Sequence, residues 1–184
     1  GHYAGASITT GRSNISVGYE SLLSCTTGTY NCAVGYEALR TNNGNYNTAM
    51  GHGALRNASG TTQMSTAVGT SALKFYTTGQ YNVAVGMEAG RGAASDNPGT
   101  GSENVYIGNG AGEDVRSASY CTAVGRAALR ELQSAENSMG LGYNAGRDAS
   151  PSGRINDDDN VICLGNNNIT ALFCADTSIS SSDS

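Results

Sequence analysis

The chain of 184 residues is poor in large and in charged side chains. It contains no Trp, 2 Phe, 2 Pro and 14% charged residues, where typical soluble domains have roughly 25%. A thick core of Leu, Ile and Phe is therefore excluded. Small residues must instead pack closely while backbone hydrogen bonds hold the chain together. Stacked β-strands meet this requirement.

Basic segments and long apolar runs are also missing. The 10 Lys and Arg are scattered and the formal net charge is −5, whereas a nucleic-acid partner needs a basic face. No apolar run approaches the roughly 20 residues of a membrane-spanning helix, so we expect no membrane insertion. Because disorder usually accompanies high net charge, the low charge content favours a folded chain.

The cysteines are odd in number and fit no metal-binding spacing. They are Cys25, Cys32, Cys121, Cys163 and Cys174. Three of them, Cys32, Cys121 and Cys163, stand at positions that other parts of the chain fill with small residues, so we expect buried space-filling side chains. The absence of a disulfide framework favours synthesis in a reducing cytosol.

The abundant residue is glycine, with 26 copies, and its placement shows a repeat. The stretch 31–39, Asn-Cys-Ala-Val-Gly-Tyr-Glu-Ala-Leu, recurs as variants at 47–55 and 65–73. Each copy is anchored on one glycine: Gly18, Gly35, Gly51, Gly69, Gly86, Gly108, Gly125, Gly142 and Gly165. The commonest interval is 17 residues, and a fixed short period is the signature of a repeat architecture.

Each position of the repeat has its own chemistry. The residue before the glycine is always apolar, the residue two before is usually small, and the residue four before is mostly Asn or Ser. The residue four after is Leu or Gly in the copies from Gly18 to Gly142. We expect the apolar residue inside the coil, the small residue to permit close approach of neighbouring backbones, and the asparagines to form an amide ladder.

These patterns predict an all-β chain, a β-solenoid or β-roll of about nine short coils with a period of about 17. The repeat covers 14–169 with inserts at 91–103 and 147–160. We expect 1–13 to be a lead-in from a missing upstream region and 170–184 to be a C-terminal strand and a Ser-rich junction. Each coil is thin, so we expect self-association through the Leu or the Val column, with the oligomer axis parallel to the rod.

Surface recognition has several candidate residues. Tyrosines recur five residues before and one residue after the repeat glycine, a spacing that predicts an aromatic ladder stiffening the rod. Alternatively, their faces stack on sugar rings. The candidates are Tyr19, Tyr36, His52 and Tyr143 from the repeat and Asp96 and Asn97 from the first insert. A second column, Glu20, Glu37 and Glu88, carries like charges, and we expect it to be exposed.

Cofactor and metal chemistry have weak candidates. The glycines of 108–112 belong to the repeat, not to a nucleotide-binding strand–loop–helix unit, and we expect no cofactor. Asp157, Asp158 and Asp159 offer oxygen ligands suited to Ca²⁺ but lack the EF-hand spacing, so a solvated loop is the preferred interpretation. We expect no resident metal.

The run Asn-Thr-Ala-Val/Met-Gly-x-x-Ala-Leu, spaced by Thr-Thr-Gly-x-Tyr, resembles the repeats of bacteriophage tail fibres and the related heads of trimeric autotransporter adhesins. The resemblance covers about 14–169. It implies a parallel homotrimer in the virion, extracellular after synthesis in the host cytoplasm, that attaches to a bacterial surface glycan or outer-membrane protein. A trimeric autotransporter head and a polysaccharide depolymerase tailspike are the alternatives.

The C-terminal residues resemble the junction of phage fibres with a self-cleaving intramolecular chaperone. The family cleaves between a Ser and an Asp, which here match Ser182 and Asp183. The basic stretch that follows the cleavage site in that family does not occur within this sequence. Apart from such processing by a downstream domain, the resemblance implies a non-enzymatic protein.

Overall fold

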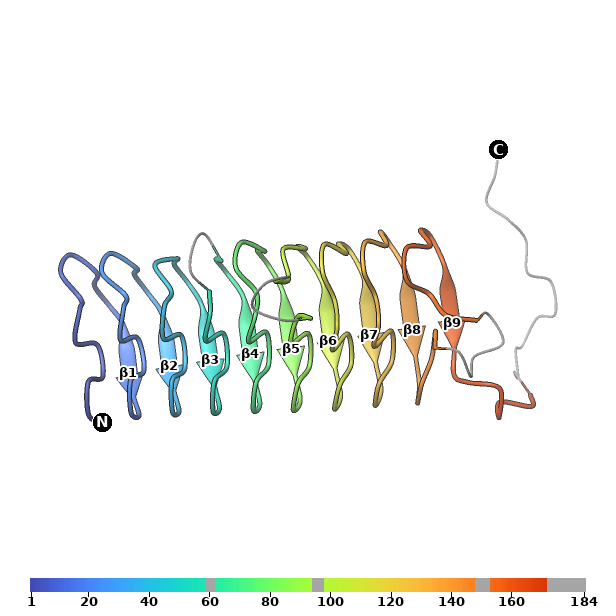
Figure 1. Ribbon diagram of the computed structural model, residues 1–184, viewed down its shortest axis with the longest axis horizontal. Coiled ribbons are helices and arrows are strands. Elements are labelled where there is room, and N and C mark those ends of the chain that lie inside the picture. Colours follow the sequence, from blue (N-terminus) through green and yellow to red (C-terminus); the bar gives the residue numbers. More distant parts are fainter. Residues whose placement is uncertain (59–61, 94–97, 148–152, 172–184) are drawn as a thin grey trace.

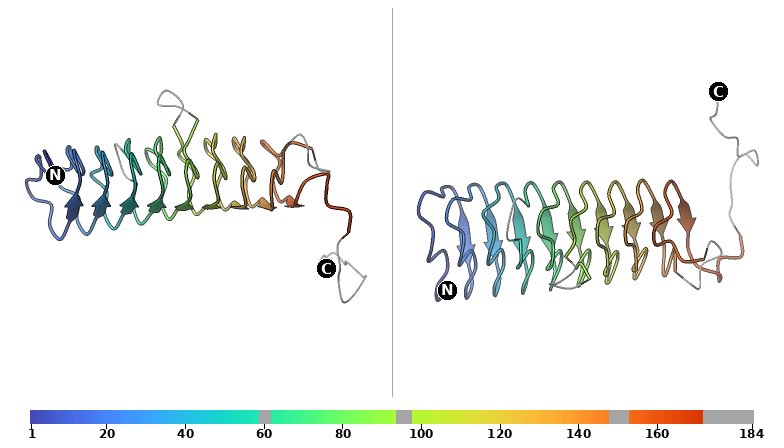
Figure 2. Two further views of the ribbon diagram at one scale, coloured as in Figure 1. Left: turned by 90° about the horizontal axis from the view of Figure 1, so that it is seen from below. Right: turned by 45° about the horizontal axis from the view of Figure 1, so that its top comes forward.

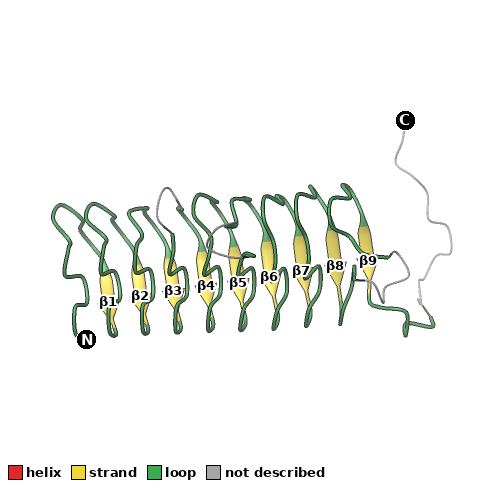
Figure 3. Cartoon of the chain, in the orientation of Figure 1, coloured by secondary structure: helices red, strands yellow, loops and turns green. Residues whose placement is uncertain are grey.

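The computed structural model describes residues 1–58, 62–93, 98–147 and 153–171. Within these residues the chain forms short β-strands joined by turns, with no helix (Figure 1, Figure 3). The strands are β1 (Ile15–Val17), β2 (Cys32–Val34), β3 (Thr48–Met50), β4 (Thr66–Val68), β5 (Val83–Val85), β6 (Val105–Ile107), β7 (Thr122–Val124), β8 (Met139–Leu141) and β9 (Ile162–Leu164). The predicted all-β architecture is confirmed.

Each strand pairs in parallel with the strand of the next coil, giving one nine-stranded sheet in sequence order. The register keeps equivalent residues together, since Ala33 lies opposite Ala49 and Ala49 lies opposite Ala67. The sheet runs along one side of the rod and the rest of each coil returns beside it (Figure 2). The chain is therefore a β-solenoid in which each coil is held by its two neighbours.

The first residues of the chain extend the stack. The N–H of Gly5 donates to the carbonyl of Ser21 (2.9 Å), and the N–H of Glu20 donates to the carbonyl of His2 (3.0 Å). The stretch 1–13, expected as a lead-in, therefore lies against the first coil through backbone hydrogen bonds of the same kind that join the later coils.

The strand side that faces the interior differs from our expectation. The middle residue of each strand points inward, as Ala33 and Ala84 do with no exposed surface, whereas Val17 is 54% exposed and Met50 is 45% exposed. The prediction that the apolar residue before the glycine lies inside is wrong. Side chains alternate across a strand, and the narrow interior accommodates alanine opposite a leucine from the turn. The valine side is consequently outside.

The core consists of stacked alanines from the strands and a column of leucines from the turns. Leucines four residues after the repeat glycine are fully buried, as are the small residues one position before them, which are alanine except for Ser21. The leucines are Leu22, Leu39, Leu55, Leu73 and Leu129. Cys121 and Cys163 are also buried, as expected, whereas Cys32 lies on the outer side of β2 and is partly exposed.

An asparagine ladder runs beside the strands, as the sequence predicts. The side-chain amide of Asn47 donates to Asn31 Oδ1 (3.2 Å), and that of Asn104 donates to Asn82 Oδ1 (3.0 Å). The same Oδ1 atoms accept backbone N–H groups, from Asn47 to Asn31 (2.9 Å) for example. Because these asparagines are buried, the ladder satisfies polar groups that would otherwise be costly to bury.

The one large residue in the inward strand column is balanced by glycines in the leucine column. Tyr106 replaces alanine on β6 and is fully buried. The leucine position is Gly90 in the coil before it and Gly112 in its own coil, and a Cβ at Gly90 would lie 2.5 Å from the Tyr106 ring. The volume that the tyrosine adds to the interior is therefore offset by the two leucine side chains that are missing beside it. The Tyr106 hydroxyl lies 3.3 Å from that of Tyr76.

The repeat glycines are required by both backbone conformation and space. They adopt φ between 110° and 138°, with Gly165 as the exception at 69°. At Gly86 (φ 134°) an added Cβ would lie 2.7 Å from the carbonyl carbon and oxygen of Gly108 in the next coil. Such a contact is with backbone, so a substitution could be accommodated only by separating the coils.

Replacing Gly86 by Ala should lower the free energy of unfolding by at least about 3 kcal/mol, from backbone strain together with the clash. The matched control is Gly153→Ala, where φ is also positive (73°) but no atom lies within 4 Å of the added Cβ; its cost should stay near 1 kcal/mol. Urea unfolding followed by far-UV circular dichroism measures both. Equal losses in the two variants would contradict the stacking argument.

The Tyr76–Tyr106 pair makes the free energy of unfolding depend on pH in the alkaline range. Burial raises the pKa of both hydroxyls well above the ordinary value of 10.0. Above pH 10 the unfolded chain loses protons that the folded chain keeps, so the free energy of unfolding should fall with rising pH, by roughly 1.4 kcal/mol per pH unit for each hydroxyl. Below pH 10 this contribution is complete. Urea titrations between pH 9 and pH 11.5 measure the slope.

The variant Tyr76→Phe removes one of the two hydroxyls and should reduce this alkaline slope by about half. Tyr81→Phe, at a half-exposed tyrosine, is the control and should leave the slope as it is in the parent chain. A slope that Tyr76→Phe does not change would show that the pair is not the origin of the effect.

Candidate interaction surface

The first and third residues of the nine strands form one continuous surface, which we call the outer sheet face. Its first column is Ile15, Cys32, Thr48, Thr66, Val83, Val105, Thr122, Met139 and Ile162, and its second column is Val17, Val34, Met50, Val68, Val85, Ile107, Val124, Leu141 and Leu164. None of these residues is charged and none is fully buried. Exposure is greatest at the last strand, where Ile162 is 68% exposed.

A surface of this composition is unusual for a single chain in water. Burying one Val, Leu or Ile side chain gains about 1.5–3 kcal/mol, and contiguous exposed apolar patches mark interaction sites. The face spans all nine strands of the sheet. A partner that covered it would therefore make contact along the whole length of the sheet. The sequence signal of this face is a pair of uncharged residues, mostly apolar or threonine, on either side of each central strand residue. The second residue of each pair is the one that we expected inside the coil.

Aromatic ladders follow the repeat beside this face. Tyr19 stacks on Tyr36 with ring centroids 5.0 Å apart, and Tyr36 stacks on His52 at 5.1 Å. In the column five residues before the glycine, Tyr30 stacks on Tyr46 at 5.0 Å. The predicted aromatic ladder is confirmed for these residues. Both faces of Tyr36 are covered by neighbouring rings, which leaves only ring edges for a ligand.

The remaining recognition candidates are separated from that stack. Tyr143 lies in the same repeat column as Tyr36 but several coils away, with the Arg126 guanidinium 5.6 Å from its ring centroid. Asp96 and Asn97 lie outside the described residues, as do Ser182 and Asp183 of the proposed processing junction. The structure therefore gathers Tyr19, Tyr36 and His52 and leaves Tyr143 apart.

The glutamate column is paired rather than freely exposed, contrary to our expectation. Arg40 Nε lies 2.8 Å from Glu20, and Arg56 Nε lies 2.7 Å from Glu37. The hydrogen bond from Arg40 lowers the pKa of Glu20. Each arginine follows a glutamate in the preceding coil, so the charges alternate along the rod and the expected repulsion is avoided.

A second group of charges lies farther along the rod. Arg91 is within 3.3 Å of Glu113 and 3.0 Å of Asp114, and Arg130 lies 2.7 Å from Glu113. Glu113 is nearly buried between the two arginines. These pairs join three successive coils. Ion pairs therefore hold neighbouring coils together here, as the asparagine and aromatic ladders do elsewhere.

Metal binding has no support in the described part of the chain, where no three potential ligands among His, Cys, Asp and Glu gather. The aspartates of 157–159 are used in coil contacts instead. Asp157 accepts a hydrogen bond from the Ser134 hydroxyl (2.7 Å), and Asp159 accepts one from the N–H of Glu136 (2.7 Å).

The buried thiols have the environment of structural residues. Burial raises the pKa of Cys25 and of Cys121. Both thiols therefore stay protonated at neutral pH, whereas a reactive cysteine needs its thiolate.

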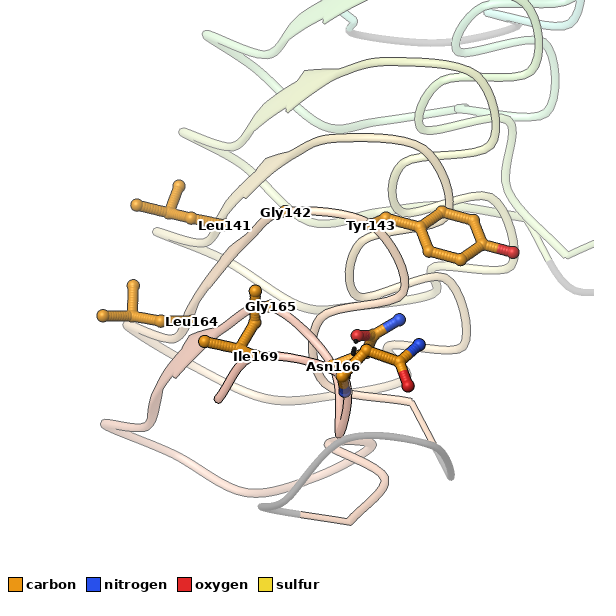
Figure 4. Close-up of a pocket in the computed structure, with 8 residues that line it drawn as sticks. Leu141, Gly142, Tyr143, Leu164, Gly165, Asn166 and Ile169 are labelled. Atoms are coloured by element: carbon orange, nitrogen blue, oxygen red, sulfur yellow. Dashed lines mark hydrogen bonds between the residues drawn. The ribbon is translucent and has the colours of Figure 1, made fainter. Parts of the chain in front are cut away.

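A cleft opens at the end of the outer sheet face, beside β8 and β9 (Figure 4). Its volume is about 400 Å³, and it is lined by Leu141, Gly142, Tyr143, Leu164, Gly165, Asn166, Asn168 and Ile169. The sequence marked Tyr143 as a recognition candidate but none of the other lining residues, because Leu141, Gly142, Leu164 and Gly165 were assigned only to packing positions of the repeat. Ile169 folds back over Gly165, where a Cβ would clash with its side chain.

Comparison with known proteins gives no relatives for this chain. No family model matches it, and neither a curated protein nor a solved structure matches it. Among the described residues, no helix is long and apolar enough to cross a membrane. Function must therefore be argued from the outer sheet face and the cleft.

Proposed function

We propose that the chain is a structural segment of an extracellular fibre of the phage tail-fibre kind, which assembles as a parallel homotrimer and attaches to a bacterial surface. The outer sheet face carries this proposal. It is uncharged over all nine strands, and a second and third copy of the same chain supply a surface of matching length and polarity.

A rotation axis parallel to the rod suits the repeat. With that symmetry, each coil meets the same coil of its partners, so Met50 lies near Met50 and Val68 near Val68. Equivalent residues then lie together between chains, just as they do between successive coils of one chain. Three copies can close around one axis while each contacts both others, which covers two adjoining columns of apolar side chains. The repeat resemblance to trimeric fibres supports three copies.

The role in attachment follows from the same architecture. A trimeric rod with paired charges and stacked rings on its sides is a rigid spacer with tyrosine and amide groups at its surface. Such groups suit a bacterial surface glycan or an outer-membrane protein, while the net charge of −5 disfavours nucleic acid. The proposed location is the virion.

The assembly is tested by sedimentation. We expect the parent chain to sediment as a trimer at micromolar concentration. Val68→Asp, at the middle of the outer sheet face, should dissociate it because three carboxylates would be buried near one axis. The control Thr70→Asp adds the same charge to an exposed turn residue two positions away and should remain trimeric. A folded monomeric parent chain would contradict the proposal.

Cys32 reports on strand direction in the same assembly. In a background of Cys174→Ser, parallel chains bring Cys32 near Cys32, so mild oxidation should give covalently linked chains. Cys25, Cys121 and Cys163 are buried within the coil and should not cross-link. An antiparallel pair would place Cys32 near β8, and no disulfide would form, which would rule out the parallel arrangement.

Attachment is tested with labelled protein on bacteria. The trimer should be retained on cells of at least one strain in a panel that displays different capsules and lipopolysaccharides. Soluble surface polysaccharide from that strain should compete if the receptor is a glycan, and protease treatment of the cells should abolish retention if it is a protein. Val68→Asp should bind weakly because it loses multivalency. Absence of retention across the panel would count against attachment.

A further inference from the structure

The aromatic column that follows the repeat glycine ends at Tyr143. The next residue of that column is Asn166 on the last coil, which is nearly buried. Asn166 Oδ1 accepts a hydrogen bond from the N–H of Asn168 (3.0 Å), so this amide is folded toward its own turn. The ring face of Tyr143 that another tyrosine would cover in a longer ladder therefore lies at the cleft, and Tyr143 is 51% exposed.

The opposite ring face of Tyr143 is supported from behind. Arg126 occupies the same column on the preceding coil, with its guanidinium 5.6 Å from the ring centroid. This contact restrains the ring and leaves one face for a ligand, in contrast to Tyr36, whose two faces contact Tyr19 and His52. A rigid aromatic platform costs little conformational entropy on binding.

The rest of the cleft is a mixture of apolar wall and amide groups. Leu141 and Leu164 lie on the side away from Tyr143, with Ile169 between them and Asn166 (Figure 4). None of the described residues that line the cleft carries a charge. An aromatic face, an aliphatic wall and neutral amides match a ligand with one C–H surface and a rim of hydroxyl groups.

We propose that this cleft binds one uncharged pyranose residue of a glycan, with the sugar's C–H face stacked on Tyr143 and its hydroxyls hydrogen-bonded to the amide of Asn168. The proposal deepens the proposed function, on which it rests for its ligand class, because it assigns the attachment glycan to one end of the rod. The cleft itself is built by a single chain. Leu141 and Leu164 belong to the outer sheet face, so in the trimer they form the border between the cleft and the partner chains, and Tyr143 lies on the side of the cleft away from that border (Figure 4).

The test uses the full chain and the methyl pyranosides of glucose, galactose, mannose, N-acetylglucosamine and rhamnose, by saturation-transfer difference NMR. We expect at least one glycoside to receive saturation, strongest on the protons of one ring face. Tyr143→Asn should reduce its affinity by roughly tenfold, which corresponds to the loss of about 1.4 kcal/mol of aromatic contact. Tyr143→Phe should retain binding because it keeps the ring.

The column itself supplies matched controls. Asn already stands in it at Asn109 and Asn166, so Tyr143→Asn should fold, as circular dichroism will check. Tyr36→Asn removes a ring from the same column whose faces are both covered, and it should leave glycoside binding unchanged. Asn168→Ala, which shortens an exposed side chain, should weaken binding without affecting the fold.

Several outcomes would overturn the site. These are saturation of none of the five glycosides, binding that Tyr143→Asn leaves unchanged, or binding that Tyr36→Asn reduces as much. Binding that appears only after removal of residues 172–184 would show that the cleft seats the chain's own end. A trimer that binds cells but no glycoside would remove this site and leave the fibre role intact. A monomer that binds a glycoside through Tyr143 would remove the trimer and leave the site.

Discussion

The close approach of successive glycine corners is the constraint on which the rest of this structure depends. At each corner from Gly18 to Gly125 the backbone of one coil lies against the carbonyl of the next, as Gly86 does against Gly108, with no space for a Cβ. Backbone hydrogen bonds between the same coils then fall into register, for example from the N–H of Gly86 to the carbonyl of Val68 (2.8 Å). Once the corners are fixed, every other repeat position must stack on its equivalents.

Stacking like on like explains which side chains occur where. Amides tolerate it because an asparagine both donates and accepts, and aromatic rings tolerate it because parallel rings in contact are favourable. Carboxylates do not, so Glu20 and Glu37 are each paired with an arginine from the following coil. The interior accepts only a fixed volume per coil, which is why Tyr106 is accompanied by Gly90 and Gly112.

The same thin coil leaves the outer sheet face uncovered, and this is the physical basis of the proposed assembly. A coil whose interior holds mostly alanines and one leucine has little apolar surface to bury within a single chain. The valines, isoleucines and methionines at the ends of its strands lie outside, where other copies of the chain can cover them. The cleft that we propose as a glycan site arises differently, since it depends on the repeat ending. Tyr143 presents a free face only because Asn166 follows it in the column.

The sequence by itself determined the period, the positions of the corners and the residues of the ladders. These follow from the spacing of the repeat, because residues one period apart stack on one another once the coils are in register. It also marked Tyr143, though only as one tyrosine among several. Only the tertiary structure decided which side of each strand lies inside. A three-residue strand has apolar residues on both sides, and the choice depends on whether Leu39 and its equivalents fold into the coil. The cleft likewise needed the fold, because Ile169 stands in the leucine column, four residues after Gly165, yet it lies over Gly165 and is 57% exposed where the leucines of that column are buried.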